Sequence, residues 1–471
     1  MDINMEIEKI VKYRNASLLF KDRKNEFALA SIIDRIKNDY KNYNFNFSEF
    51  ENISLKQMDK VRHIKKYKDF STEEVLCIYL KRVLDRKFHI KYPNRNEYMH
   101  SLFDMISALS KMNDFSIYRF DFKDFFNTVS SEYVFKKFIL ASSLERDQLD
   151  LLEKFVKETK YAYAGLNTSN IICEIIAKHF DEILTQKFKH YGLIFYRRYI
   201  DDGILIFNTR IDEAKCLSII NETINEVFDD KGINVIKRCK TRINESKSKY
   251  ISIRDMKSNI GSITLNGASR KKLDEKEFDF LGYEFRIISW LYKKKMGLRF
   301  EIVFKYGITQ QKIDKYTNRI KKIIDDYIKD KDVELLRHRL KAFTHRTVYQ
   351  VQRNNSMIWK SKGFISNYTE LRYRTDSLTK ETTTFLKKSI LNYCRREFRG
   401  KLPYFLKGKE DESIYSLMNN LENNRTLLFV EPIGINQSGL EKLCKQIGIE
   451  TSNKKYEDLV GEYLIKVNVG H

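Results

Sequence analysis

The first 115 residues show mainly the hydrophobic spacing of helices. Residues 71–74, Ser-Thr-Glu-Glu, have the pattern of a capping box, which marks the start of a helix. Apolar residues then recur on one helical face: Val75, Leu76, Tyr79, Leu80, Val83 and Leu84. A basic run precedes this stretch: Lys60, Arg62, Lys65, Lys66 and Lys68. We therefore expect residues 1–115 to form a mainly helical region.

The pattern changes between residues 115 and 300, where short β-rich runs alternate with helices. Ile117–Phe122 and Gly192–Phe207 have the apolar, aromatic character of strands. Ser169–Phe188 has the spacing of a helix, and residues 261–305 look like further strands.

After Thr309 the chain becomes helical again. An apolar stripe runs through Ile313, Tyr316, Ile320, Ile323, Ile324 and Tyr327. Lysines cover the rest of this helix, either as a solvated face or as a face toward nucleic acid: Lys312, Lys315, Lys321 and Lys322. Thr426–Val430 reads as a strand. Because no Gly/Ser-rich or Pro-rich linker occurs, we expect the domains to pack together.

Composition narrows the class of protein. A chain of 471 residues suggests two or three domains, and 42% hydrophobic residues suffice for a core. No apolar run reaches the about 18 residues of a membrane helix, and residues 1–15 lack the apolar stretch of a signal peptide. The six cysteines are scattered, without a C-x-x-C pair, which argues against a zinc ribbon or a disulfide framework. We expect a cytoplasmic protein without membrane contact.

The net charge points to a polyanionic partner. Lys and Arg number 87 against 64 Asp and Glu, which gives a formal charge of +23. Such a surplus is typical of proteins that bind nucleic acid. The chain is also rich in Lys, Asn and Ile, a bias that low-G+C coding could produce.

Three acids in apolar surroundings carry the most specific chemistry. Asp121 ends a strand among aromatic residues, a costly position unless a positive group meets it. Asp201 and Asp202 lie between two apolar strands, followed by Gly203. Taken alone, the Asp-Gly pair indicates an ordinary hairpin turn. If the strand of Asp121 lies beside this hairpin, the three carboxylates converge.

Converging carboxylates repel one another and raise one another's pKa values. Mg²⁺ removes that penalty, because hard cations prefer carboxylate oxygens and keep positions open for phosphates. Two such ions, about 4 Å apart, stabilise the attacking and leaving oxygens of an in-line displacement. The pattern therefore predicts nucleotidyl transfer.

In these residues the sequence resembles the reverse transcriptase family. Four motifs occur in the family's order. They are Asp121–Phe126 (motif A), Gly165–Glu174 (motif B), Tyr199–Asp202 (motif C, Y-x-D-D) and Asp279–Tyr283 (motif E, F-L-G-Y). The resemblance implies an α+β right-hand fold with fingers, a palm built on an antiparallel sheet, and a thumb. It implies a mainly helical N-terminal region and fingers over 1–115, a palm over 116–305, and a mainly helical thumb and C-terminal region over 306–471.

The resemblance also assigns roles to residues. Asp121 and Asp201 would bind two Mg²⁺ ions, for which Mn²⁺ could substitute, and Asp202 would be the third acid. The implied nucleotide-binding residues are Phe122 through its backbone carbonyl, Asp124, Phe126, Gly165 and Arg95. The implied primer grip is Phe280, Leu281, Gly282 and Tyr283.

Two of these roles have alternatives. Phe126 would lie under the incoming sugar and exclude a 2′-hydroxyl, although core packing also explains a phenylalanine there. Lys247 would be the general acid for pyrophosphate, but it lies 46 residues beyond Asp201. Lys249 or Lys257 could serve instead. Each of these lysines could also be an ordinary surface residue without a catalytic role.

Motif B departs from the usual family pattern, because Leu166-Asn167 stands in place of Pro-Gln. The following Thr-Ser-x-Ile-Ile-x-Glu-Ile resembles abortive-infection and, more loosely, retron enzymes of bacteria. We expect an RNA-directed DNA polymerase that copies a structured or non-coding RNA into DNA in antiphage defence. Its partners would be an RNA template, dNTPs, the DNA product and, as an open question, a second copy or a partner protein.

Two other functions stay open at this point. The first is protein-primed or untemplated DNA synthesis, which the altered motif B permits. The second is a non-catalytic RNA-binding scaffold on a polymerase fold, against which the intact acids argue.

Overall fold

The computed structural model describes residues 2–18, 22–57, 60–229, 240–257, 270–294, 297–353, 356–398, 403 and 414–468. The chain forms two compact units. Unit 1 comprises Met1–Leu18, Arg23–Tyr98 and Lys111–Ser258, and unit 2 comprises Leu19–Asp22, Met99–Ser110 and Asn259–His471. Helix α4 (Arg95–Leu109) begins in unit 1 and ends in unit 2. The predicted three-domain division stays a prediction.

Unit 1 contains a helical N-terminal part and a four-stranded sheet. Its longer helices are α1 (Ile3–Ala16), α2 (Glu26–Lys41), α3 (Thr72–Phe88), α7 (Arg146–Thr159), α8 (Ser169–Phe188) and α9 (Glu213–Phe228). Its strands are β1 (Glu51–Gln57), β2 (Lys60–Lys66), β3 (Ser116–Asp121), β4 (Leu193–Tyr199), β5 (Asp202–Phe207) and β6 (Lys249–Ser252). Shorter turns of helix are α5 (Phe125–Thr128), α6 (Ser131–Val134), a π-helical turn (Phe135–Ile139), 3₁₀ turns (Lys189–Tyr191, Glu245–Lys247) and α10 (Ile253–Lys257).

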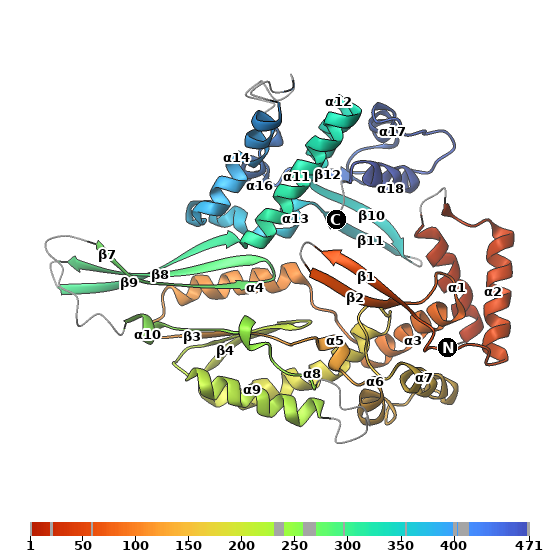
Figure 1. Cartoon of the computed structure of the whole chain (residues 1–471), viewed down its shortest axis with the longest axis horizontal. Helices are drawn as coiled ribbons and strands as arrows, with labels where there is room; N and C mark the ends of the chain where they lie inside the picture. The colour runs from red at the N-terminus through yellow and green to blue at the C-terminus, as the bar shows by residue number, and fades with distance from the viewer. Residues whose placement is uncertain are drawn as a thin grey trace. The chain divides into compact units, whose positions relative to one another are not determined.

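The four-stranded sheet is antiparallel, with strand order β4-β5-β3-β6. Helices α8 and α9 cover one of its faces (Figure 1), and their apolar residues share one core with β3 and β5. Every residue of β3 is buried, including the polar Ser116, Arg119 and Asp121. The strands predicted over Ile117–Phe122 and Gly192–Phe207, and the helix over Ser169–Phe188, are confirmed.

The N-terminal region differs from expectation in one element. The basic run lies mostly in β2, which pairs with β1 as an antiparallel hairpin. Leu55 and Val61 in this hairpin are exposed, so the strands lack the buried alternation that signals a strand in sequence. The start of α3 is as predicted, since the Ser71 side chain accepts a hydrogen bond from the Glu74 amide (3.1 Å).

Unit 2 contains two three-stranded sheets and a set of helices. Its strands are β7 (Arg270–Phe280), β8 (Tyr283–Lys294), β9 (Gly297–Ile308), β10 (Arg346–Arg353), β11 (Ser356–Lys362) and β12 (Thr426–Phe429). Its helices are the second part of α4, α11 (Gln310–Asp330), α12 (Val333–Thr344), α13 (Phe364–Asn367), a 3₁₀ helix (Thr369–Ser377), α14 (Lys380–Glu397), α16 (Leu417–Glu422), α17 (Gln437–Gln446) and α18 (Tyr456–Lys466).

The first sheet of unit 2 is the antiparallel meander β7-β8-β9, and the second has the order β11-β10-β12. Phe103 of α4 packs on the meander, 5.2 Å from the Tyr283 ring and 5.1 Å from the Phe285 ring. The strands predicted over 261–305 are confirmed from Arg270 onward, and residues 261–269 lie outside the described part. The helix predicted after Thr309 is α11, whose apolar stripe is buried from Ile313 to Ile324.

No helix in the described part of the chain is both long enough and apolar enough to span a bilayer. The five cysteines in that part are buried and not joined in disulfides, and Cys239 lies outside it.

Candidate active site

The sheet of unit 1 brings together the three acids that the sequence singles out. Asp121 ends the central strand β3 and pairs in register with Asp202, the first residue of β5. Asp201 lies in the turn just before Asp202, and its carbonyl accepts a hydrogen bond from the Phe122 amide (2.9 Å). The two segments, 80 residues apart in sequence, therefore meet at one end of the sheet.

The hairpin that carries Asp201 is present, but the predicted Asp-Gly turn is wrong. Tyr199 pairs with Asp202, so the two turn residues are Ile200 and Asp201. Ile200 has φ 60°, an unfavourable backbone conformation for a β-branched residue. Gly203 lies within β5, where a Cβ atom would come 2.2 Å from the Phe120 ring. The glycine is needed for this close ring contact and not for the turn.

Two basic side chains contact the acids. The Lys247 Nζ lies 2.8 and 2.9 Å from the two carboxylate oxygens of Asp121. An Arg119 Nη2 lies 2.6 Å from Asp202. Lys247 is thus the predicted lysine that the structure brings to the acids, whereas Lys257 donates to the Asn113 carbonyl (2.9 Å). The amide of Asn244 also donates to the Asp121 carbonyl oxygen, which fixes the segment that carries Lys247 (2.7 Å).

These contacts do not fully compensate the negative charge of the acids. Burial raises the pKa of Asp202 to about 7, although Arg119 opposes this and the two other acids add to it. Burial also raises the pKa of Asp201, and the nearby Asp121 raises it further. Both shifts mean that another positive charge here would be favourable. In the described part of the chain, no group of three or more His, Cys, Asp or Glu side chains, these acids included, is placed so that it could hold a metal ion as it stands.

A second charged group supports the hairpin from the opposite face of the sheet. Arg198 of β4 donates to Glu174 (2.9 and 3.2 Å) and to Asp181 (2.9 Å), both on α8. The same guanidinium donates to the Ile200 carbonyl at the hairpin tip (2.8 Å). The Arg198 side chain is only 3% exposed, so it links α8 to the turn of Asp201 inside the core.

The residues after Asp121 form a short helical turn. Phe122 is buried and stacks on Phe125, with ring centroids 4.9 Å apart. Asp124 is exposed with φ 52° and accepts a hydrogen bond from Asn127 (2.6 Å). Phe126, in α5, is half-buried and therefore partly available to a ligand. Phe126 also packs against the buried core beside Phe125, so the alternative reading of this residue as a packing residue stays open.

Gly165 allows the β1-β2 hairpin to approach the start of α8. Its φ is 104°, and a Cβ atom there would lie 2.5 Å from the Lys65 carbonyl oxygen. The Lys65 amide donates to the Ala164 carbonyl (2.8 Å), and its Nζ lies 3.1 Å from the centroid of the Tyr163 ring. The same hairpin carries Arg62, an exposed residue whose charge opposes in part the burial that raises the pKa of Asp201.

Comparison with known proteins decides the family. Residues 12–285, more than half of the chain, match the family described as reverse transcriptase (RNA-dependent DNA polymerase). The chain belongs to the reverse transcriptase family. The predicted enzyme class, an RNA-directed DNA polymerase and hence a nucleotidyltransferase, is confirmed by this match, as is the predicted α+β polymerase fold. No match was found among curated proteins.

The solved structures that resemble this reverse transcriptase include telomerases. Apo telomerase from Candida tropicalis, truncated from its C-terminal domain, is 13% identical, with a TM-score of 0.31 over 54% of this chain and 58% of that chain. Telomerase from Candida albicans with a TWJ fragment of telomeric RNA is 12% identical, with a TM-score of 0.33 over 89% of this chain and 64% of that chain. Telomerase from Candida tropicalis with the same kind of RNA fragment is 12% identical, with a TM-score of 0.32 over 93% of this chain and 68% of that chain. The chain thus spans less than two thirds of the first two telomerase chains.

The remaining predicted residues of this reverse transcriptase lie on other elements. Arg95 is half-buried at the first residue of α4. The predicted primer grip forms the hairpin of β7 and β8 in unit 2, with Leu281 (φ 50°) and Gly282 (φ 84°) as its two turn residues. Two positive φ values in a row are what a two-residue hairpin turn of this kind requires.

Sequence reasoning missed three basic residues of the reverse transcriptase site. Arg119 could have been found, because it precedes Asp121 by two positions and must lie on the same face of a strand. Arg62 was visible only as part of a basic run. Arg198 gave no usable signal, since its partners Glu174 and Asp181 lie 24 and 17 residues away on a helix.

Proposed function

We propose that this reverse transcriptase copies an RNA template into DNA by extending a primer with dNTPs. One observation carries the proposal: Asp121, Asp201 and Asp202 meet at the end of one sheet, with Lys247 in contact with Asp121. A fold that served only as a scaffold would have no use for three partly buried acids whose charges are incompletely balanced.

The acids have the chemistry that divalent cations require. Asp121 and Asp201 would hold Mg²⁺, with Mn²⁺ as a substitute, and Asp202 would contribute a third carboxylate. All three offer hard oxygen donors, and the raised pKa values of Asp201 and Asp202 show that their charges are not fully compensated. The bound ions would supply electrostatic stabilisation of the attacking 3′-oxygen and of the leaving pyrophosphate.

The protein's own residues would bind and orient the nucleotide. Lys247, released from Asp121, would give its proton to the leaving pyrophosphate. Arg62 would place positive charge beside the triphosphate, a role that sequence reasoning gave to Arg95. The half-buried Phe126 would exclude a 2′-hydroxyl and so select deoxynucleotides.

Primer extension on a defined RNA template tests this proposal. We expect Mg²⁺-dependent DNA synthesis, and we expect Asp201→Asn to reduce it by at least about 10³-fold, because charge stabilisation is usually the largest single contribution to catalysis. Asp150→Asn is the matched control, since Asp150 lies on α7 and its side chain is 55% exposed. Equal synthesis by the wild type, Asp201→Asn and Asp150→Asn would reject the site.

We further propose that the enzyme acts in the cytoplasm of a bacterium as part of antiphage defence, with a structured RNA as its template. The support lies in motif B, whose Thr-Ser-x-Ile-Ile-x-Glu-Ile sequence resembles that of abortive-infection enzymes. The unpaired, buried cysteines in the described residues suit a reducing compartment. We expect cells that carry the gene to survive phage infection better than cells with Asp201→Asn. Sequencing of the co-purifying nucleic acid identifies the template.

The second candidate is protein-primed or untemplated synthesis. At the position where the family usually has Pro-Gln, Leu166 is buried and Asn167 is exposed, so the template-facing side chain of this turn is altered. Reactions without added template or primer separate the two candidates. DNA that stays attached to the protein after denaturation supports the second, and strict dependence on both added strands excludes it.

A further inference from the structure

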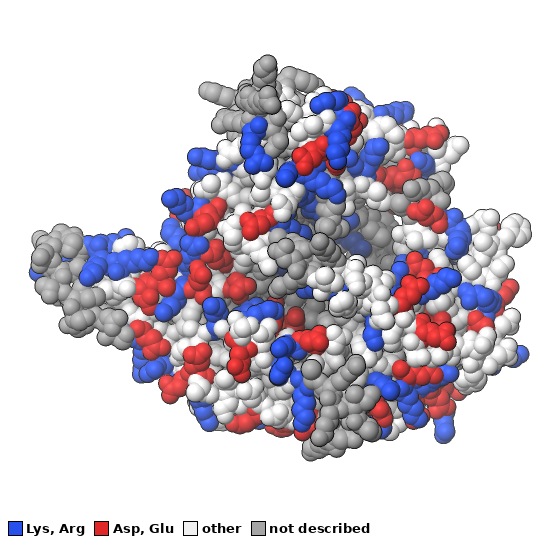
Figure 2. Space-filling view, viewed as in Figure 1, with Lys and Arg blue, Asp and Glu red and all other residues white. Residues whose placement is uncertain are grey.

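The positive charge of the chain is not spread as one uniform field. Lys and Arg alternate with Asp and Glu over the face shown in Figure 2. A surface of this kind binds polyanions weakly, because opposite charges partly cancel and salt screens the rest. A specific anion site needs a place where cations meet without acids and partly out of water.

One cavity of unit 2 meets this condition. It has a volume of about 260 Å³ and lies among α11, α12, β11, α13 and the end of α18. Four cationic residues line it: Lys315, Arg319, Arg339 and Lys362. No Asp or Glu is among the described residues of its wall. Arg339 is paired with Asp326 (3.6 Å) and Asp330 (3.7 Å), but neither acid lines the cavity.

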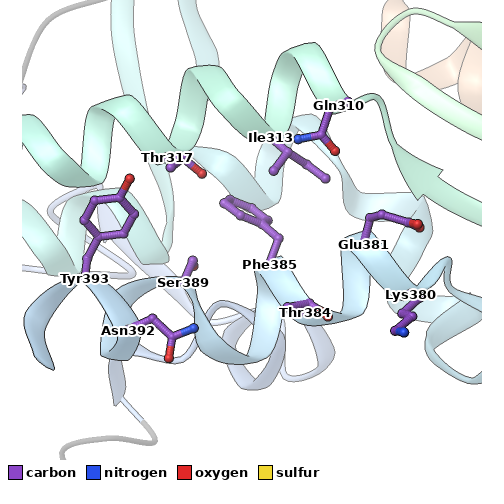
Figure 3. Close-up of a pocket in the computed structure, with 10 residues that line it drawn as sticks. All are labelled: Gln310, Ile313, Thr317, Lys380, Glu381, Thr384, Phe385, Ser389, Asn392 and Tyr393. Carbon is purple, nitrogen blue, oxygen red and sulfur yellow. The ribbon is translucent and has the colours of Figure 1, made fainter. Parts of the chain in front are cut away.

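Two other cavities of unit 2 show that this charge is unusual. The groove between α11 and α14, about 460 Å³, contains the apolar side chains of Ile313 and Phe385, with Lys380 and Glu381 at one end (Figure 3). A smaller cavity of about 130 Å³ has Glu431 and Glu457 in its wall and no Lys or Arg among its described residues. The surplus of cations therefore belongs to the first cavity and not to cavities of this unit in general.

The cations of the first cavity are also unequally hydrated. The side chains of Lys315 and Lys362 are exposed at the rim, whereas Arg319 is partly buried and Arg339 is 14% exposed. Burial lowers the pKa of Arg319, so its charged form is less favourable in this cavity than in water. A bound anion would favour that charged form.

The remaining wall indicates what kind of anion the cavity accepts. The rings of Tyr316, Phe343 and Phe364 contribute an apolar, aromatic part. Thr347 and Ser361 add hydroxyl groups. Guanidinium and ammonium groups bind phosphate oxygens, and aromatic rings accept a sugar or a base. The volume admits one nucleotide unit and excludes a duplex.

We propose that this cavity binds the terminal phosphate of a nucleotide, either a free mononucleotide or the 5′-phosphorylated end of a nucleic-acid strand. Arg319 and Arg339 would bind the phosphate from inside, and Lys315 and Lys362 would close the site from the rim. The site lies entirely within unit 2 and does not depend on the acids of unit 1.

Calorimetric titration of the full chain without divalent cations tests the proposal. The probes are inorganic phosphate, dAMP, and one short oligodeoxynucleotide with either a 5′-phosphate or a 5′-hydroxyl. The test variant is Lys315→Gln with Lys362→Gln. The matched control is Lys321→Gln with Lys360→Gln, which removes the same charge from exposed positions of the same helix and strand, outside the cavity.

We expect the test variant to bind the phosphate probes at least about tenfold more weakly, since two charge-assisted contacts are lost, while the control binds like the wild type. Tight dAMP binding without a preference for the 5′-phosphorylated strand identifies a free nucleotide. A preference for the 5′-phosphate that the test variant loses identifies a strand end. Equal weakening in both variants, or no binding of any probe by the wild type, overturns the proposal.

Arg319→Gln provides a second variant from inside the cavity. We expect it to lose phosphate binding while its thermal unfolding stays cooperative. Primer extension, measured in parallel, distinguishes the two proposals. Absence of DNA synthesis with intact phosphate binding would contradict the polymerase site of unit 1 and leave the phosphate site standing. DNA synthesis without phosphate binding would contradict the phosphate site alone.

Discussion

Two groups of carboxylates lie on the two faces of the sheet in unit 1, and they are neutralised in different ways. Behind the sheet, Glu174 and Asp181 share Arg198, which is 3% exposed. In front, Asp121 contacts Lys247, whose side chain is 47% exposed. Arg198 is held by both acids and by the Ile200 carbonyl, whereas Lys247 has a flexible stem that reaches in from solvent.

This difference in exposure separates a group of charges that supports the structure from a group that can take part in a reaction. A fully enclosed guanidinium with several acceptors fixes a structure and cannot leave without exposing buried charges. A solvent-accessible lysine can be displaced by cations or by a nucleotide at small cost. The first group holds the hairpin, and the second is the one that can exchange its partner during a reaction. The following substitutions, in order of expected effect, test this division.

Removal of Arg198 should have the largest effect. Arg198→Gln leaves the buried Glu174 and the partly exposed Asp181 without their cation, so we expect the free energy of unfolding to fall by about 3 kcal/mol. DNA synthesis should fall with it, because the turn of Asp201 loses its support. Denaturant unfolding provides the measurement. The control is Arg254→Gln, which breaks an exposed ion pair with Asp114 (2.7 Å; Arg254 63% exposed).

For that exposed pair we expect a loss of at most about 1 kcal/mol. A similar small loss for Arg198→Gln would contradict the supporting role. Arg198→Lys should recover part of the stability and little of the synthesis, because an ammonium group cannot reach both acids and the Ile200 carbonyl together.

Removal of Lys247 should change the reaction and leave the fold intact. We expect Lys247→Gln to slow nucleotide incorporation by about 10²-fold, the usual effect of losing a general acid. The loss of stability should be smaller than for Arg198→Gln, because the Asn244 side chain still donates to Asp121 (3.3 Å). Lys249→Gln is the comparison, since Lys249 is exposed on β6 and was a rival for the same role. An equal effect of both substitutions would show that only general positive charge matters.

Shortening of Phe126 should have the smallest effect. Phe126→Ala opens the half-buried position after Asp121, so we expect the preference for dNTPs over rNTPs to fall by about tenfold. Competition between the two kinds of nucleotide on one template measures this preference. The control is Phe138→Ala, which removes an aromatic ring from the π-helical turn Phe135–Ile139 and should leave the preference unchanged. An unaltered preference in Phe126→Ala would return this residue to a packing role.

Much of this site could be predicted because its motifs are local. Asp121, Asp201 and Asp202 were found from their strands, and Lys247 from its place after motif C. The turn was misread because an Asp-Gly pair is a turn signal in most sequences, whereas Gly203 here makes room for Phe120. That ring lies on a different strand, so the reason for the glycine appears only in three dimensions.

Features that depend on distant partners could not be predicted. The β1-β2 hairpin has exposed apolar positions and no clear alternation, so its lysine-rich segment did not read as a strand. Arg198 looked like any basic residue beside motif C, because its contacts depend on how α8 packs against β4. The cavity of unit 2 brings together residues from positions 315 to 468, which no sequence window spans.

The conformation of Ile200 has a consequence for engineering. Its φ of 60° opposes the intrinsic preference of isoleucine and is held by Arg198, which binds the carbonyl of the same residue. The tip of motif C is therefore shaped by the body of the protein and not by its own sequence. A peptide or a grafted loop that carried Tyr199–Gly203 alone would relax to another turn and scatter its acids. Transplanting this group of acids into another scaffold would require α8 and its two carboxylates as well.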